Sequence, residues 1–192
     1  METATRPREI LDAALDVFTQ RGYHGATIEE IRAASGASIG SIYHHFAGKQ
    51  ELAAALYLDG LRDYQQAFLE VLEQGGDAEA TVKAIVENHL RWVAEHPKMA
   101  SYLMNSREVD VARATEPELR TMNRAVIDAT REWVERGVIA GTLRALPTAL
   151  YYALLIGPAQ EFARQWLRRR DRKALTEAQD ALGQAAWRAV RA

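Results

Sequence analysis

The side chains best suited to chemistry in this sequence of 192 residues lie between Thr27 and Lys49. Hydroxyl, phenol and imidazole groups follow one another from Ser38 to His45, and such groups hydrogen-bond to base edges and phosphate oxygens. Gly40 and its small neighbours let the backbone approach a base edge closely. Lys49 opens a further helix, whose free N–H groups favour a phosphate. The candidate DNA contacts are Thr27, Ser38, Ile39, Gly40, Ser41, Tyr43, His44 and Lys49.

Two short helices joined by a tight turn would position these groups. Thr27 and Glu30 match a capping box that begins the first helix. Gly36 falls where the chain must turn, since glycine tolerates a positive φ at no steric cost. Ser38 can cap the second helix, which has Ile42 among its buried positions. The pattern predicts a helix-turn-helix whose second helix enters the major groove of DNA.

The same stretch is similar to the DNA-binding domain of the TetR family of repressors, over residues 8–56. One departure is Arg32, because helix-turn-helix proteins commonly place a small residue where the helices approach most closely. Its stem would have to run outward along the helix. The residues that carry the resemblance are Phe18, Gly22, Tyr23, Ala26, Thr27, Ile31, Gly36, Ser38–Phe46 and Lys49.

The resemblance implies a transcriptional repressor that binds a palindromic operator and is released by a small, mostly apolar ligand. In the resembled family, the fourth helix transmits ligand occupancy to the DNA-binding domain. One short recognition helix reads few bases, so helix-turn-helix proteins usually bind as dimers across two half-sites. We therefore expect three partners: double-stranded operator DNA, a small-molecule effector and a second copy of the chain.

Two other functions stay open on the sequence alone. Residues 1–50 contain five Lys and Arg against six Asp and Glu, so the basic footprint usual for DNA-binding proteins is missing. This favours a helical ligand-binding or interaction protein without sequence-specific DNA activity. An enzyme is the weaker alternative, since the chain has no Gly-rich phosphate loop, nucleophile elbow or H-E-x-x-H run.

The spacing of apolar residues predicts an all-α protein of about nine helices, and no stretch shows the alternation of a strand. We expect residues 1–50 to form a three-helix, helix-turn-helix DNA-binding domain. Residues 51–192 would form a helical regulatory domain for ligand binding and dimerisation. A long helix at Lys49–Gln74 spans the boundary. A capping box beginning at Thr115 predicts the start of a later helix, and Thr176 the N-cap of the last.

Aromatic and thioether side chains of the second domain are suited to line an apolar pocket, in which a few polar groups would orient a ligand. Aromatic residues at helical spacing more often belong to an ordinary core, so each assignment competes with that alternative. The candidate ligand contacts are His89, Trp92, Tyr102, Asn105, Met122, Val126 and Tyr152.

The last two predicted helices carry apolar residues and many alanines, which allow helices to approach closely. In the resembled family these two helices pair with their counterparts in a second subunit. The alternative is that the apolar residues belong to the core of one chain. The basic run at Arg168–Lys173 fits a solvated loop near a helix C-terminus better than a phosphate site. The candidate interface residues are Leu155, Phe162, Trp166, Leu182 and Ala186.

Composition excludes several classes of protein. The chain has no cysteine, which excludes disulfides and thiol catalysis and is compatible with a reducing cytosol. No run approaches about 18 apolar residues and the N-terminus is polar, so we expect neither a membrane span nor a signal peptide, and a cytoplasmic protein. His89 and His96 share a helix face, but without cysteine or a carboxylate–histidine pattern we expect no metal. No cofactor is expected.

Overall fold

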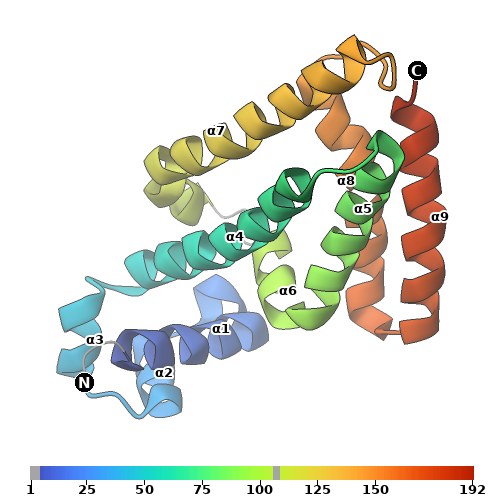
Figure 1. Cartoon of the computed structure of the whole chain (residues 1–192). Helices are drawn as coiled ribbons and strands as arrows, with labels where there is room; N and C mark the ends of the chain where they lie inside the picture. The colour runs from blue at the N-terminus through green and yellow to red at the C-terminus, as the bar shows by residue number, and fades with distance from the viewer. Residues whose placement is uncertain (1–4, 106–108) are drawn as a thin grey trace. The chain divides into compact units, whose positions relative to one another are not determined.

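The computed structural model of the chain describes the backbone of residues 5–105 and 109–192, and within these ranges the protein is all-α, as predicted (Figure 1). The only pairing of extended backbone in the described ranges is an isolated bridge between Leu143 and Arg191. The helices are α1 (Thr5–Gly25), α2 (Ile28–Ser35), α3 (Ile39–His45), α4 (Lys49–Gln74), α5 (Ala78–Glu95), α6 (Pro97–Asn105), α7 (Val109–Ile139), α8 (Thr148–Arg169) and α9 (Arg172–Val190).

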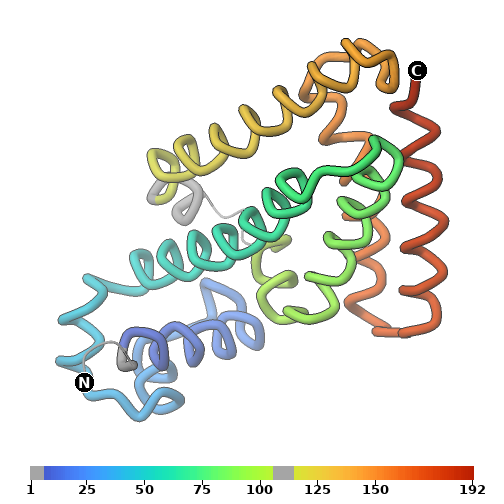
Figure 2. The backbone as a smooth tube through the Cα atoms, viewed as in Figure 1, coloured from blue at the N-terminus to red at the C-terminus, as the bar shows by residue number. Residues whose placement is uncertain are grey.

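The chain forms two compact units, and both α4 and α7 contribute residues to each of them. The first unit comprises the described residues up to Arg62 together with those of Lys98–Arg120, and the second comprises Asp63–Pro97 and Thr121–Ala192. The tube in Figure 2 can be followed from one unit into the other along α4 and again along α7. The units therefore differ from the predicted division after residue 50, because α6 and part of α7 belong with the N-terminal helices.

The core of the first unit explains why α6 belongs to it. Tyr102 of α6 stacks on Phe18 with the ring centroids 5.9 Å apart, and its hydroxyl donates to the carbonyl of Ala53 at 2.9 Å. Gly60 of α4 allows a close approach, since a Cβ there would lie 2.3 Å from the Sδ of Met99. The other fully buried large side chains of this core are Ile10, Ile31, Ile42, Leu52 and Leu56.

In the second unit, α5 packs against both α8 and α9. Its apolar stripe is fully buried, and Trp133 of α7 meets Tyr151 of α8 edge to face at 6.4 Å. Gly183 brings α9 close to α5, since a Cβ there would lie 3.4 Å from the Cγ of Lys83. The stripe of α5 is made of Val82, Ile85, Val86, Leu90 and Val93.

Two predicted helix starts are wrong. Thr115 lies inside α7, which already begins at Val109, and it is fully buried, so it does not cap a helix start. The last helix begins at Arg172, because the carboxylate of Asp171 accepts the backbone N–H groups of Lys173 and Ala174. A carboxylate at the N-cap satisfies two N–H groups that would otherwise lack partners.

Candidate functional site

The helix-turn-helix of the first unit has the caps and the turn that the sequence predicts. The Thr27 hydroxyl accepts the N–H of Glu30 at 3.2 Å, and the Glu30 carboxylate accepts the N–H of Thr27 at 2.9 Å. Gly36 has φ 64° and donates its N–H to the carbonyl of Arg32 at 3.0 Å. Ser38 caps α3 by accepting the N–H of Ser41 at 3.1 Å. These local bonds fix the direction in which α3 leaves the turn.

The recognition helix α3 presents one face to solvent and buries the other. Ile42 is completely buried in the core of the unit. Ile39 is 45% exposed and Tyr43 53% exposed, so both side chains are accessible on the outer face of the helix. Gly40 and His44 are also exposed. Positions three to four apart share a helix face, so these residues lie beside Ile39 and Tyr43. The exposed face of α3 (Ile39, Gly40, Tyr43 and His44) thus offers apolar, phenol and imidazole contacts next to accessible backbone.

Three other predicted DNA contacts either form hydrogen bonds within the chain or are partly buried. Thr27 and Ser38 are exposed, and each uses its side-chain oxygen as a helix cap. Ser41 is half-buried. Their contacts with DNA stay predictions.

Lys49 has a role that the sequence analysis missed. Its Nζ donates to the carbonyls of Tyr23 and Ala26, both at 2.9 Å, and to that of His24 at 3.4 Å. The ammonium also lies 4.8 Å from the centre of the Tyr23 ring. An ammonium has three N–H donors, and the three carbonyls lie in the last residues of α1 or directly after it. In this structure Lys49 therefore joins α4 to the end of α1, and its contact with a phosphate stays a prediction.

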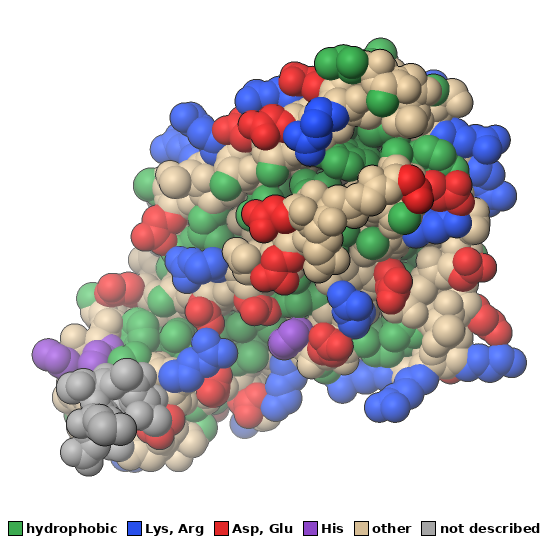
Figure 3. Space-filling model, viewed as in Figure 1, with side chains coloured by type: hydrophobic (Ala, Val, Ile, Leu, Met, Phe, Trp, Pro, Cys, Tyr) green, Lys and Arg blue, Asp and Glu red, His purple; other side chains and the backbone are tan. Residues whose placement is uncertain are grey.

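The other cations that the structure describes between residues 7 and 50 are paired with carboxylates. Arg8 pairs with Asp59 at 2.9 Å and Arg21 pairs with Glu30 at 3.5 Å. Arg32 reaches Glu29 at 2.6 Å, so its stem runs outward along the helix as expected. On the face shown in Figure 3, basic and acidic side chains are interspersed. The other cations described between residues 7 and 50 are consequently neutralised within the chain.

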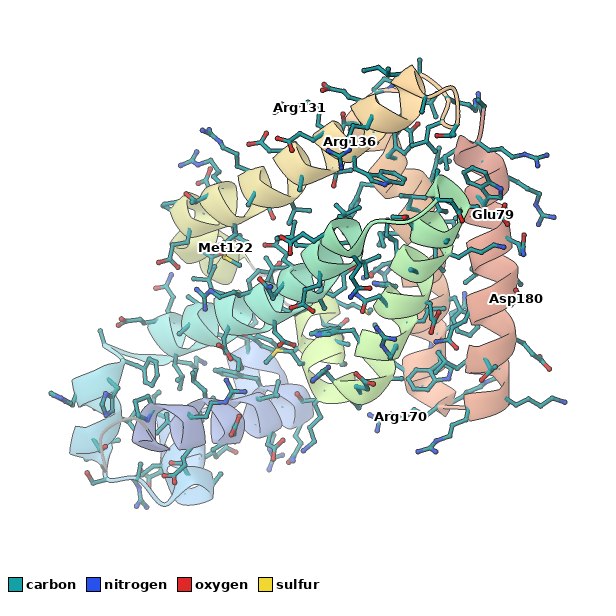
Figure 4. The ribbon with its side chains drawn as sticks, in the orientation of Figure 1. Glu79, Met122, Arg131, Arg136, Arg170 and Asp180 are labelled. Atoms are coloured by element: carbon teal, nitrogen blue, oxygen red, sulfur yellow. The ribbon has the colours of Figure 1, made fainter. Side chains whose placement is uncertain are left out.

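The predicted ligand contacts are divided between the two units. Tyr102 belongs to the core of the first unit, and Asn105 is exposed there, with its Nδ2 donating to the carbonyl of Ser101 at 2.8 Å. The remaining candidates lie in the second unit. His89 and Trp92 are buried, Met122 (labelled on α7 in Figure 4) and Val126 are half-buried, and Tyr152 is 54% exposed.

Three consecutive residues of α4 bind polar groups of the second unit, and the sequence analysis did not identify them. Asp63 accepts the indole N–H of Trp92 at 2.7 Å. The Tyr64 hydroxyl lies 2.8 Å from Nδ1 of His89. Gln65 donates to the side-chain carbonyl of Asn123 on α7 at 2.8 Å. Their spacing in α4 gave no signal, because their partners are on other helices.

His89 is the most unusual polar residue of this unit. It is only 2% exposed, and burial lowers its pKa from 6.5 to about 4. Its Nε2 has no hydrogen-bond partner among the residues that the structure describes. Burial also raises the pKa of Tyr64 well above 10.0, so the pair is neutral near pH 7.

The predicted interface residues are mostly inside the second unit. Leu155, Trp166 and Ala186 are buried in its core, whereas Phe162 and Leu182 are half-buried. For the three buried residues, the alternative of a core role within one chain is therefore the correct one. Figure 4 shows Arg170 at the turn between α8 and α9. Its φ is 54° and its backbone N–H donates to the carbonyl of Trp166, which ends α8.

No group of three or more His, Asp or Glu side chains in the described part of the chain is arranged to hold a metal ion. No helix within the described ranges combines the length and the apolar character that a bilayer crossing requires.

Comparison with known proteins gives a consistent set of relatives. Residues 10–56 match the family described as "Bacterial regulatory proteins, tetR family". The HTH-type transcriptional repressor AcnR of Corynebacterium efficiens is 30% identical over 141 residues, which cover 71% of this chain and 68% of that protein. The HTH-type transcriptional repressor KstR2 of Rhodococcus jostii is 29% identical over 141 residues, covering 73% and 69%.

A solved structure extends the likeness to almost the whole chain. The transcriptional regulator FadR of Bacillus subtilis, in complex with stearoyl-CoA, superimposes with a TM-score of 0.77 at 16% identity. The match covers 93% of this chain and 96% of that one. At this level of identity the likeness shows a common fold, including the helices beyond residue 56.

Proposed function

The chain belongs to the TetR family of bacterial regulatory proteins, and on that premise we propose that it represses transcription by binding an operator through α3 until a small, mostly apolar ligand releases it. Members of this family bind operator DNA and small-molecule effectors, typically as dimers. The chain is a transcriptional regulator and not an enzyme, like the relatives to which it is similar.

The exposed face of α3 is the observation that carries the DNA-binding proposal. A helix whose inner side chains are fixed in a core and whose outer side chains include an exposed Ile and Tyr is suited to enter the major groove. The paired cations argue against a purely electrostatic contact. We therefore expect affinity to depend more on α3 side chains than on lysine and arginine.

A gel-shift assay with the DNA upstream of the protein's own gene tests this proposal. Tyr43→Ala removes an aromatic side chain that is 53% exposed on α3, and should weaken binding at least tenfold if a good contact is lost. Tyr152→Ala is the matched control, because it removes a tyrosine that is 54% exposed in the other unit. Equal binding by both variants and by the unmodified protein would refute the role of α3. Failure of the unmodified protein to bind would favour the interaction-protein alternative.

The dimer interface that we propose is the exposed side of α8 and α9. Leu150, Ala153 and Gly157 of α8 are exposed on neighbouring turns, and Ala181 and Ala185 are exposed on α9. Apart from its chain neighbours and its own helix backbone, a Cβ at Gly157 would have no atom within 4 Å among the described residues, so this side is open in one subunit. Small residues allow two helices to approach closely, and Leu150 supplies an apolar contact at one end.

Analytical ultracentrifugation of Gly157→Glu tests the dimer. A carboxylate buried unpaired between subunits should break association, whereas it would stay solvated on a free surface. Ala125→Glu places the same charge at an exposed position of α7 and serves as the control. A Gly157→Glu protein that remains as dimeric as the control would move the interface elsewhere.

The ligand-release mechanism requires a difference in affinity between two arrangements of the protein. A ligand that binds both arrangements equally shifts nothing, and a ligand that weakens DNA binding is itself weakened by DNA to the same extent. A coupling of about 1–3 kcal/mol corresponds to roughly a 5–150-fold loss of operator affinity. Because the B. subtilis regulator was solved with stearoyl-CoA, acyl-CoA thioesters belong in the ligand screen. A tight ligand that leaves operator affinity unchanged would refute the mechanism for that ligand.

A further inference from the structure

A buried polar pair joins α4 to α5 in the second unit. The hydroxyl of Tyr64 lies 2.8 Å from Nδ1 of His89, and the two rings meet edge to face at 5.6 Å. Trp92 covers the same tyrosine, with ring centroids 5.1 Å apart. His89 is 2% exposed, yet its Nε2 has no partner among the described residues. An unpartnered buried polar group lowers the stability of the fold, so a role beyond packing is indicated.

The hydrogen-bond partners of Tyr64 and His89 determine which nitrogen carries the proton. If the tyrosine donates to Nδ1, the proton of the neutral ring is on Nε2, and one donor lacks a partner. If Nδ1 donates instead, both the phenol proton and the lone pair of Nε2 lack partners among the described residues. The first arrangement leaves fewer unsatisfied groups. Nε2–H is therefore a buried donor without an acceptor.

We propose that Nε2–H of His89 is the polar anchor of the effector, and that the effector presents to it an uncharged, carbonyl-type oxygen on a largely apolar segment. This inference rests on the proposed function, in which a ligand controls the protein. A neutral acceptor fits better than a carboxylate, because a neutral imidazole cannot compensate the charge of an anion transferred from water to this interior. The aromatic rings of Tyr64 and Trp92 supply the apolar contacts.

The same pair explains how such a ligand would act on α4. Nε2 is covered by neighbouring side chains, so an acceptor reaches it only after those side chains move. Ligand-bound and ligand-free arrangements therefore differ, which is what coupling requires. A movement of His89 reaches α4 through the hydrogen bond between its Nδ1 and Tyr64. The neighbours of Tyr64 on α4, Asp63 and Gln65, form hydrogen bonds with α5 and α7. α4 is also the helix that begins with Lys49 in the first unit.

NMR of the protein with nitrogen-labelled histidine tests the ligand-free state. The resonances of His89 are assigned by their loss in His89→Phe. We expect the neutral form protonated at Nε2 near neutral pH, with a slowly exchanging proton because the site is buried. A neutral ring protonated at Nδ1 would overturn the inference, since Nε2 would then accept and not donate.

Ligand chemistry is tested with probes of matched shape. Acetophenone, cyclohexyl methyl ketone and methyl hexyl ketone are compared with benzoate, cyclohexanecarboxylate and heptanoate, and with ethylbenzene, ethylcyclohexane and octane. At least one ketone should shift the Nε2 resonance of His89 and bind more tightly than its carboxylate and hydrocarbon counterparts. Absence of any ketone-induced shift, or equal binding of ketone and hydrocarbon, would overturn the inference.

Variants then separate the anchor from general packing. His89→Phe should weaken ketone binding roughly 5- to 100-fold, because the carbonyl loses its donor, and should leave hydrocarbon binding unchanged. His89→Gln, which keeps a donor and an acceptor, should retain most of the affinity and remains informative if the phenylalanine variant folds poorly. His24→Phe alters an exposed histidine of the first unit and is the control. Ketone binding by His89→Phe equal to that of the unmodified protein would overturn the inference.

Operator binding without ligand, measured on the same proteins, keeps the two proposals distinguishable. If the unmodified protein does not bind the operator, the proposed function is refuted, while its preference for ketones can still be measured. Normal operator binding without any ketone preference would refute the anchor alone.

Discussion

Replacing Lys49 with methionine tests whether this lysine is a structural clamp or a phosphate contact. In the structure its ammonium donates to the carbonyls of Tyr23 and Ala26, both at 2.9 Å, and more weakly to that of His24. Methionine retains an unbranched, apolar stem of similar length and removes the charge. The two short bonds are charge-assisted, and such bonds contribute about 1.5–3 kcal/mol each when fully buried.

The expected loss of folding stability is smaller than the summed contributions of two such bonds. Lys49 is half-buried, so water can reach part of the site and replace some of the lost interaction. We expect Lys49→Met to lower the free energy of unfolding by about 2 kcal/mol. Operator affinity should also fall, because the end of α1 leads directly into the capping box of α2 at Thr27. The dependence of affinity on salt should not change, since no phosphate contact is removed.

Urea unfolding followed by circular dichroism measures the stability change, and fluorescence anisotropy with labelled operator at several salt concentrations measures the slope. Lys98→Met is the matched control, because Lys98 forms an exposed ion pair with Asp16 in the same unit. Such a pair contributes about 0–1 kcal/mol. A Lys49→Met protein as stable as this control, with a salt slope reduced by about 1, would refute the clamp and restore the phosphate contact.

Three further predictions follow from single residues. Gly36→Ala should destabilise the first unit by about 1 kcal/mol or more in urea unfolding, because φ at this position is 64°; an unchanged midpoint would mean that the turn adapts. Tyr43→Phe should weaken binding to all DNA sequences alike in anisotropy titrations, if the phenol contacts a phosphate; a changed base preference would instead indicate a base contact. The stability of the second unit should decrease as pH falls from 6.5 toward 4, by up to about 3 kcal/mol, because the unfolded chain protonates His89 while the folded chain keeps it neutral. Fluorescence-detected melts report on this unit alone, since all four tryptophans lie in it, and His89→Phe should flatten the pH dependence.

Structural features that depend on residues close together in the sequence could be predicted from it. The capping box of Thr27 and Glu30, the positive φ of Gly36 and the cap at Ser38 each depend on atoms at most four residues away. The predicted bounds of the long helix, Lys49–Gln74, likewise agree with those of α4. These features could be predicted because the backbone geometry of a turn or helix end strongly restricts which residues fit.

Interactions between segments far apart in the chain could not be predicted from the sequence. Lys49 has partners 23 to 26 residues before it, and Tyr64 and His89 are 25 residues apart. Periodicity identified Tyr102 as one of several aromatic residues on a helix, but not the core that it joins. The same limit explains the interface residues, because an apolar stripe on α8 fits the core of one chain as well as a second subunit.

The paired cations of the first unit have a consequence for how the protein finds its operator. Arg8, Arg21 and Arg32 are each neutralised by a carboxylate, and Lys49 is occupied by carbonyls. Unspecific affinity for DNA comes almost entirely from cations that displace counterions, so these four cations should add little to the binding of unrelated sequences. Sliding along the chromosome would be brief, and the search would proceed mainly by three-dimensional diffusion. In exchange, few copies would be sequestered on other DNA, and a small pool of protein would suffice to occupy one operator.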